Sequence, residues 1–81
     1  MAKVNQEQQM NTIFQSIPLI RRYPSDHIWI DYDRSADVLY MNFERPQRAT
    51  DSVLKDDVLV RSKNGKVIGL TVLNASKFRK A

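Results

Sequence analysis

Apolar residues recur with a helical period near the start of the chain and with a strand period afterwards. The helical stretch places four of them on one stripe, at intervals of three and four residues: Met10, Ile13, Phe14 and Ile17. Asn5 is a candidate N-cap, and Gln8 stands where it completes a variant of the capping box. Because Pro18 disfavours helical geometry at Ile17, the pattern predicts a helix over residues 5–17. Three turns are marginal in water, so this helix should pack on another element.

From residue 28 the period changes to two. Apolar and polar residues alternate over 28–33, turn-forming residues follow, and 38–43 predicts a second strand with Leu39, Met41 and Phe43 on one face. A short extended segment is predicted at 51–54. The chain from 28 to 74 therefore predicts an antiparallel sheet.

The most specific local signal is Asn64-Gly65, which predicts a two-residue type I′ turn between strands 58–63 and 66–73. A two-residue loop would pair Leu59 with Leu70, Val60 with Gly69 and Arg61 with Ile68. One face would then carry Leu59, Ile68, Leu70 and Val72, and the other Val58, Val60, Val67 and Thr71. Both faces would be apolar near the middle.

Together these elements predict an α+β fold in one domain, residues 1–81. An N-terminal amphipathic helix packs on a small antiparallel β-meander of four to five strands, and 75–81 forms a basic tail. A narrow helix covers only one apolar face. The other requires sheet curvature, a barrel-like closure or a second subunit, and a homodimer is the favoured expectation.

Composition narrows the functional classes. The 81 residues allow a single thin-cored domain, and 42% hydrophobic with 27% charged residues is typical of a globular protein. No apolar run approaches the ~18 residues of a membrane span, and no secretory signal is recognisable, so we expect a bacterial-type cytoplasmic protein without membrane contact. The absence of cysteine excludes disulfides and thiolate metal sites.

Charge is unevenly distributed behind the net charge of +4: residues 61–81 contain six bases and no acid. This pattern could attract nucleic acid, give an oligomer complementary patches, or simply solvate the surface. The candidate nucleic-acid contacts are Arg21, Arg22, Lys77, Arg79 and Lys80.

Two stretches carry a family resemblance. The first contains Tyr32, Asp33, Asp37, Leu39 and Tyr40, and the second contains Gly65, Gly69, Leu73, Asn74 and Ala75. Over about residues 28–77 the chain resembles the bacterial domain of unknown function 2283, and the N-terminal helix lies outside the resemblance. The resemblance implies a small β-rich fold without an established activity. It also implies, for some members, an antitoxin role beside a small toxin-like nuclease.

The sequence gives little support for a catalytic site or a metal site. An EF-hand frame begun by Asp31, Asp33 and Ser35 fails, because its glycine and final glutamate positions hold Ala36 and Asn42. The favoured interpretation has Asp33 and Asp37 accepting backbone N–H groups of a tight connection. The only histidine, His27, has no nucleophile frame around it and is expected at the surface or at a strand entry. We therefore expect no enzyme activity, metal or cofactor.

Aromatic residues beside arginines could form stacking platforms, although alternating aromatics more often form a core. We expect Phe43 in the core, whereas for Trp29 the core and a stacking platform are equally supported. Gly69 indicates close approach of backbone or of an aromatic ring. The leading hypothesis is a non-catalytic protein-interaction module with a homodimeric or nuclease partner. The alternative is a nucleic-acid-binding module, and a hydrolase using Asp33, Asp37 and His27 ranks third.

Overall fold

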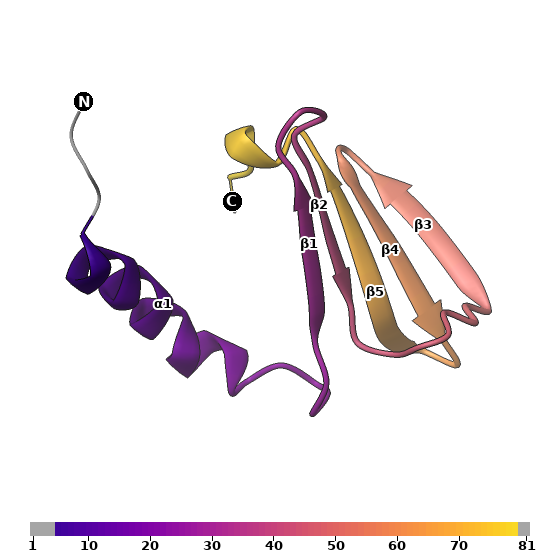
Figure 1. Cartoon of the computed structure of the whole chain (residues 1–81). Coiled ribbons are helices and arrows are strands. Elements are labelled where there is room, and N and C mark those ends of the chain that lie inside the picture. The colour runs from indigo at the N-terminus through magenta and orange to yellow at the C-terminus, as the bar shows by residue number, and fades with distance from the viewer. Residues whose placement is uncertain (1–4, 80–81) are drawn as a thin grey trace.

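The structure, a computed structural model, describes residues 5–79 and confirms the α+β class. One N-terminal helix precedes a five-stranded antiparallel sheet (Figure 1). The elements are α1 (Gln6–Ile20), β1 (Trp29–Asp33), β2 (Val38–Asn42), β3 (Asp51–Lys55), β4 (Val58–Lys63), β5 (Lys66–Leu73) and the short 3₁₀ helix η1 (Ala75–Lys77).

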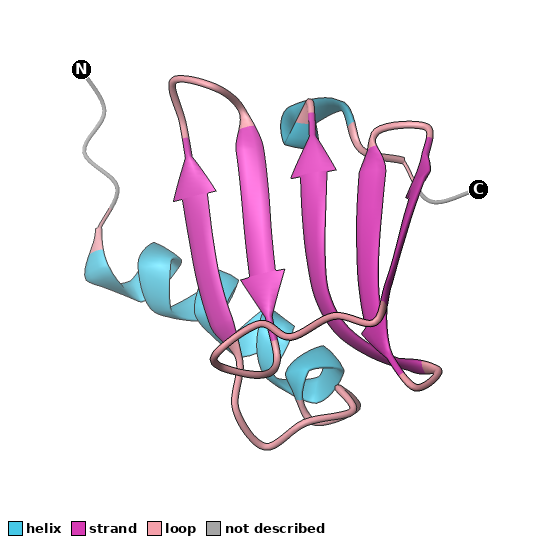
Figure 2. Cartoon of the chain, turned by 90° about the vertical axis from the view of Figure 1, so that its right-hand side faces the viewer, coloured by secondary structure: helices cyan, strands magenta, loops and turns pink. Residues whose placement is uncertain are grey.

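The strand order is β1-β2-β5-β4-β3, which differs from an uninterrupted meander. Strand β2 pairs with β5 and not with β3. This pairing joins the β1–β2 hairpin to the β3–β4–β5 meander in one sheet. The segment between β2 and β3 therefore crosses one end of the sheet (Figure 2). Turn signals alone do not determine which hairpins become neighbours.

Helix α1 begins as predicted, with Asn5 Oδ1 accepting the Gln8 N–H at 2.8 Å. Its predicted end at Ile17 is wrong, because the helix continues through Pro18 to Ile20. Pro18 removes one N–H donor, but the final turn is closed by Arg21 N–H to Ile17 O (3.1 Å) and Arg22 N–H to Leu19 O (3.0 Å). One missing hydrogen bond near a helix end is thus tolerated.

The Asn64-Gly65 turn is confirmed, since both residues have positive φ, 51° and 84°. The predicted pairing holds only for the first rungs of this hairpin. A β-bulge between Arg61 and Ser62 shifts the register, so that Arg61 pairs with Gly69, Val60 with Leu70 and Leu59 with Thr71. The predicted face assignment was therefore wrong beyond the turn.

The shifted register changes which residues share a face. Val58, Val60, Leu70 and Val72 now share one face with residues of β1 and β2. The opposite face receives Arg61, Gly69 and Thr71 together with Leu59 and Leu73, so both faces carry apolar residues, as expected, but not the predicted ones.

The core is small. Among the described residues, three hydrophobic side chains are buried: Phe43, Ile68 and Val72. Phe43 lies in the core, as expected, with its ring edge-on to Tyr23 at 5.5 Å between centroids. No residue of α1 is buried.

The two faces are covered differently. Figure 2 shows α1 and η1 behind the sheet, whereas the segment joining β2 to β3 passes in front of it. Among the described residues, no helix has the length and apolar character needed to cross a bilayer.

Candidate interaction surface

The face of the sheet on the side of α1 carries two cross-strand rows of apolar residues, here named the apolar face. The sheet register brings these residues together as Ile30, Met41, Leu70, Val60 and Val53 in one row and Tyr32, Leu39, Val72 and Val58 in the other. Of these, Ile30 remains 50% exposed and Val53 54% exposed. Only Val72 is buried, so the rest of the apolar face stays at least partly open to solvent.

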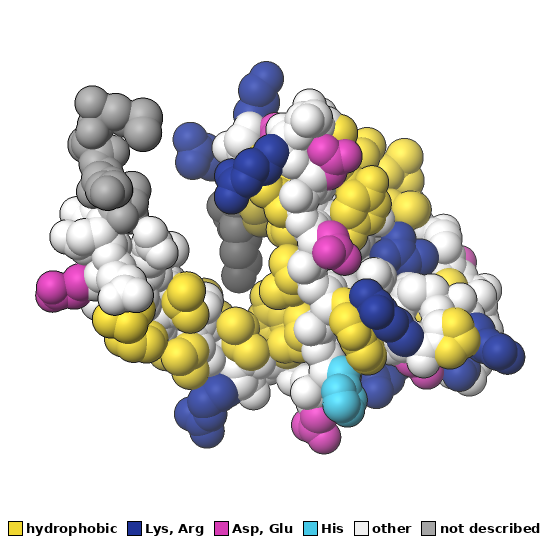
Figure 3. Space-filling model, in the orientation of Figure 1, with side chains coloured by type: hydrophobic (Ala, Val, Ile, Leu, Met, Phe, Trp, Pro, Cys, Tyr) yellow, Lys and Arg dark blue, Asp and Glu magenta, His cyan; other side chains and the backbone are white. Residues whose placement is uncertain are grey.

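A second apolar surface lies along α1 and is here named the helix stripe. It consists of the four residues that the sequence pattern selected: Met10, Ile13, Phe14 and Ile17. Ile13 is 60% exposed and Phe14 55% exposed. Figure 3 shows hydrophobic side chains along the helix, with open space between its N-terminal half and the sheet. Within residues 5–79, the helix stripe is thus left exposed.

The exposed area of the whole chain is large for its size. The chain exposes 7003 Å², whereas a compact protein of 9.4 kDa exposes about 5,000 Å². Its Cα radius of gyration is 14.7 Å, against about 12 Å for a compact domain of this length. The excess is on the order of 2,000 Å².

The apolar face also contains a hollow of about 440 Å³ at the end where β3 turns into β4. Val58, Val60 and Leu73 contribute its apolar wall, with Phe78 from the segment after η1. Asp56, Asp57, Lys77 and Arg79 stand among its lining residues. An apolar floor with charged residues around it is typical of a site that receives a bulky side chain of another protein.

Asp37 ties the β1–β2 turn to the C-terminal segment. One of its carboxylate oxygens accepts the Tyr32 hydroxyl at 2.6 Å and the Ser76 N–H at 2.9 Å, and the other accepts the Ser76 hydroxyl at 2.6 Å. Its carbonyl accepts the Ala75 N–H at 3.0 Å. The hydrogen bonds from Ser76 and Tyr32 lower the pKa of Asp37, and the bond to Asp37 raises the pKa of Tyr32.

Asp33 also follows the favoured interpretation, because its carboxylate accepts the Ala36 N–H of the same turn at 3.1 Å. Asp37 differs in one respect: its backbone donor comes from Ser76, 39 residues away, and not from its own turn. In residues 5–79, no three His, Cys, Asp or Glu side chains are grouped as ligands for a metal ion.

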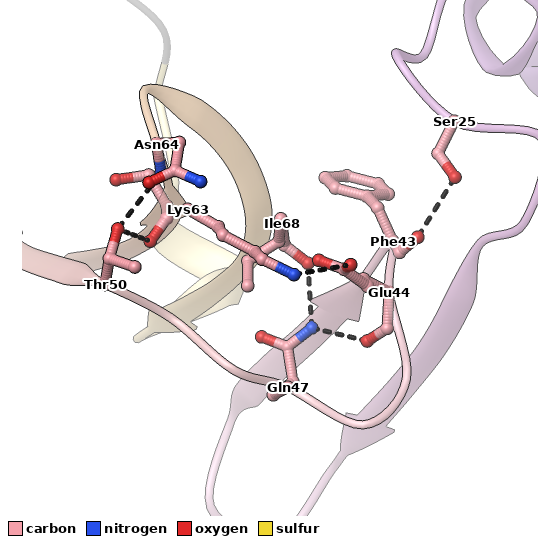
Figure 4. Close-up of polar contacts among 9 residues, drawn as sticks. Ser25, Phe43, Glu44, Gln47, Thr50, Lys63, Asn64 and Ile68 are labelled. Atoms are coloured by element: carbon pink, nitrogen blue, oxygen red, sulfur yellow. Dashed lines mark hydrogen bonds and ion pairs between the residues drawn. The ribbon is translucent and has the colours of Figure 1, made fainter.

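The opposite face centres on Arg61, whose guanidinium binds three neutral acceptors. Nε donates to Gln47 Oε1 at 3.0 Å, while the two terminal nitrogens donate to Thr71 Oγ1 and Asn42 Oδ1, both at 2.9 Å. Figure 4 shows how Gln47 is itself held, by donating to the carbonyls of Glu44 (2.6 Å) and Ile68 (2.9 Å). The segment joining β2 to β3 is thereby fastened over β5.

Gly69 lies directly beneath this cluster. A Cβ there would stand 2.6 Å from Gln47 Oε1, 2.8 Å from Arg61 Nη2 and 2.9 Å from Asn42 Oδ1. Close approach was predicted for Gly69, but the approaching atoms are polar side chains of the same chain, and neither backbone nor a ring. Position 69 therefore requires glycine for space, since only Gly65 of the two has a positive φ.

The family description "Protein of unknown function (DUF2283)" matches residues 29–76, well over half of the chain. The chain belongs to this family. The match confirms the resemblance expected from the sequence and leaves α1 outside it. Neither the curated proteins nor the solved structures contain a match.

The residues that carry the DUF2283 resemblance mainly build the fold. Tyr32, Asp37 and Asn74 meet at one end of the sheet, where Asn74 adopts φ 51° and its side chain donates to Asp57 Oδ2 at 3.3 Å. Gly65 lies at the hairpin turn at the opposite end. Leu39 lies on the apolar face, whereas Tyr40 lies on the other face, 39% exposed.

The aromatic residues near the start of β1 form a small exposed stack. His27 is exposed and lies two residues before the start of β1, as expected, and its ring stacks on Trp29 with centroids 5.7 Å apart. The Arg45 guanidinium lies 4.7 Å from the centre of the same indole ring. Six residues of extended chain, about 20 Å, separate His27 from Asp33, so the hydrolase residues do not converge.

The basic residues do not form one patch either. Arg21 and Arg22 follow α1 and lie at one end of the sheet, whereas Lys77 and Arg79 belong to the segment around η1 at the other end (Figure 1). Lys80 lies outside the described residues.

The hydrogen-bonded pair of Gln47 and Arg61 was not predicted from the sequence. The signal that could have revealed it is Gly69, because a single glycine within a strand often marks a bulge or a close approach.

Proposed function

We propose that this chain is a non-catalytic protein-binding module whose apolar face and helix stripe bind another protein chain. One observation supports this proposal most strongly. Only three hydrophobic side chains among the described residues are buried, whereas both the apolar face and the helix stripe are largely exposed to solvent. Surfaces of this kind on a small protein are typical of interaction sites.

The arrangement of the polar groups supports a non-catalytic role. The carboxylates of Asp33 and Asp37 are engaged in bonds that fix the β1–β2 turn and η1, and the His27 ring is stacked on Trp29. Each of the three hydrolase candidates therefore has a structural task. An antitoxin role beside a small nuclease is one instance of the proposed function, with the nuclease as the bound chain.

A matched pair of helix variants tests the proposal. Phe14→Glu places a charge on the helix stripe, whereas Gln15→Glu places the same charge on the opposite, also exposed side of α1. Light scattering and the fluorescence of an apolar dye report, respectively, association and open apolar surface. We expect Phe14→Glu to abolish association or reduce dye binding, and Gln15→Glu to behave as the wild type.

A compact 9.4 kDa wild-type protein that binds no dye and is insensitive to Phe14→Glu would contradict the proposal. Titration with a labelled oligonucleotide tests the nucleic-acid alternative. Affinity that falls steeply between 50 and 200 mM salt, and that is lost with Lys77→Ala and Arg79→Ala, would replace protein binding by nucleic-acid binding.

A further inference from the structure

We infer that the chain bound by the apolar face is α1 of a second copy, in a twofold dimer that exchanges its helices. The inference rests on the proposed function and names its partner. Each copy carries one helix stripe and one apolar face, so two copies cover both surfaces of both chains in a closed, one-to-one assembly.

The segment after α1 holds the helix away from its own sheet. The Arg22 and Tyr23 N–H groups close turns onto the carbonyls of Leu19 and Ile20, both at 3.0 Å. The Tyr23 ring then packs on Phe43, and the Ser25 hydroxyl donates to Phe43 O at 3.0 Å. These contacts anchor the connection at the end of β2, and the turns at Arg22 and Tyr23 set the direction in which α1 leaves it.

The charge of both surfaces favours a second copy over a charged partner. Glu7 is the only charged residue of α1, and the rows of the apolar face from β1, β2, β4 and β5 contain none. The nearby charged residues are Lys55 on β3 and those around the hollow, at one end of the apolar face. What each surface requires is an uncharged apolar counterpart, which the chain itself supplies.

The area is also of the right size. A standard interface buries about 800 Å² on each partner, which is less than half of the excess of about 2,000 Å² on each chain. The hollow of about 440 Å³ beside Val58, Val60 and Phe78 offers space on the apolar face for a large side chain of the incoming helix.

Cysteine pairs test the exchange, because the chain has no cysteine of its own. Ile13→Cys marks the helix stripe and Met41→Cys marks the centre of the apolar face. The two single variants are mixed, allowed to re-equilibrate and oxidised at low concentration. We expect a mixed disulfide between position 13 of one copy and position 41 of the other. As a control, Gln15→Cys, on the side of α1 opposite the stripe, should cross-link to Met41→Cys about 10-fold less or weaker still.

The outcomes separate the inference from the proposed function. A dimer that cross-links through position 41 alone is a sheet-to-sheet dimer: it overturns helix exchange and leaves the binding function standing. An extended monomer that binds apolar dye likewise overturns the inference and leaves the function to another partner. A compact monomer without dye binding overturns both.

Discussion

Arg61 lies so close over Gly69 that a Cβ there would stand 2.8 Å from its Nη2, and the guanidinium would have to move to admit one. The bulge between Arg61 and Ser62 creates this relationship by pairing Arg61 with Gly69. The same bulge places Val58 and Val60 of β4 on the face of Leu70 and Val72. One local irregularity thus organises both sides of the sheet.

Gly69→Ala is expected to destabilise the fold by about 1–3 kcal/mol, since the added methyl group overpacks a cluster that is hydrogen-bonded on three sides. For a domain of this size, each kcal/mol lowers the melting temperature by roughly 4–8 °C. Thermal unfolding followed by circular dichroism measures the effect.

The double variant Gly69→Ala/Arg61→Ala supplies the control. Removing the guanidinium frees the space that the methyl group needs, so the cost of Gly69→Ala should fall in the Arg61→Ala background. Equal costs in both backgrounds would show that Arg61 does not determine the requirement for glycine.

Gly65→Val is expected to cost about 1–3 kcal/mol, because it places a β-branched residue at φ 84°. No atom lies within 4 Å of a Cβ built there, so the penalty comes from the backbone conformation and not from crowding. Gly65→Asn should recover much of the loss, since asparagine tolerates positive φ. A melting temperature unchanged by Gly65→Val would contradict the turn.

Asp37 should make the protein more sensitive to acid. Its pKa in the folded state is lower than in the unfolded chain, because Ser76 and Tyr32 donate hydrogen bonds to the carboxylate. Its contribution to stability is therefore fully present above about pH 4, and it is lost as the pH falls through the lowered pKa of the folded state.

Asp37→Asn should consequently lower the melting temperature at neutral pH and flatten its decline below pH 4. Asp31→Asn, on the exposed strand β1, serves as the matched control and should leave the acid limb unchanged. Denaturation curves from pH 2 to 7 decide between them. An Asp37→Asn variant whose acid limb is as steep as that of the wild type would refute this role.

Sequence patterns predicted the elements of this fold better than their arrangement. The strands 58–63 and 66–73 and the turn between them follow from Asn64-Gly65 and from β-branched residues, which are local signals. The pairing of β2 with β5 depends on side-chain packing across the sheet, which no local signal encodes. The helix continues past Pro18 because the N–H groups of Arg21 and Arg22 close its last turn.

The candidate surface was predicted in part and for a partly wrong reason. The residues of the helix stripe were identified correctly, but the stripe was expected to pack on the sheet and instead lies exposed. Both sheet faces carry apolar residues, as expected, but the bulge at Arg61 places Val58 and Val60, not Leu59, on the face of Leu70 and Val72. A bulge depends on what fills the space above it, here Arg61 and Gln47, and turn length alone could not reveal it.

The mass of the wild-type protein in solution tests the central claim most directly. We predict that sedimentation equilibrium at tens of micromolar gives about twice 9.4 kDa, equally at low and high salt, because the surfaces that associate are apolar. A single species of 9.4 kDa at both salt concentrations, with a radius of gyration near the ~12 Å of a compact domain, would contradict it.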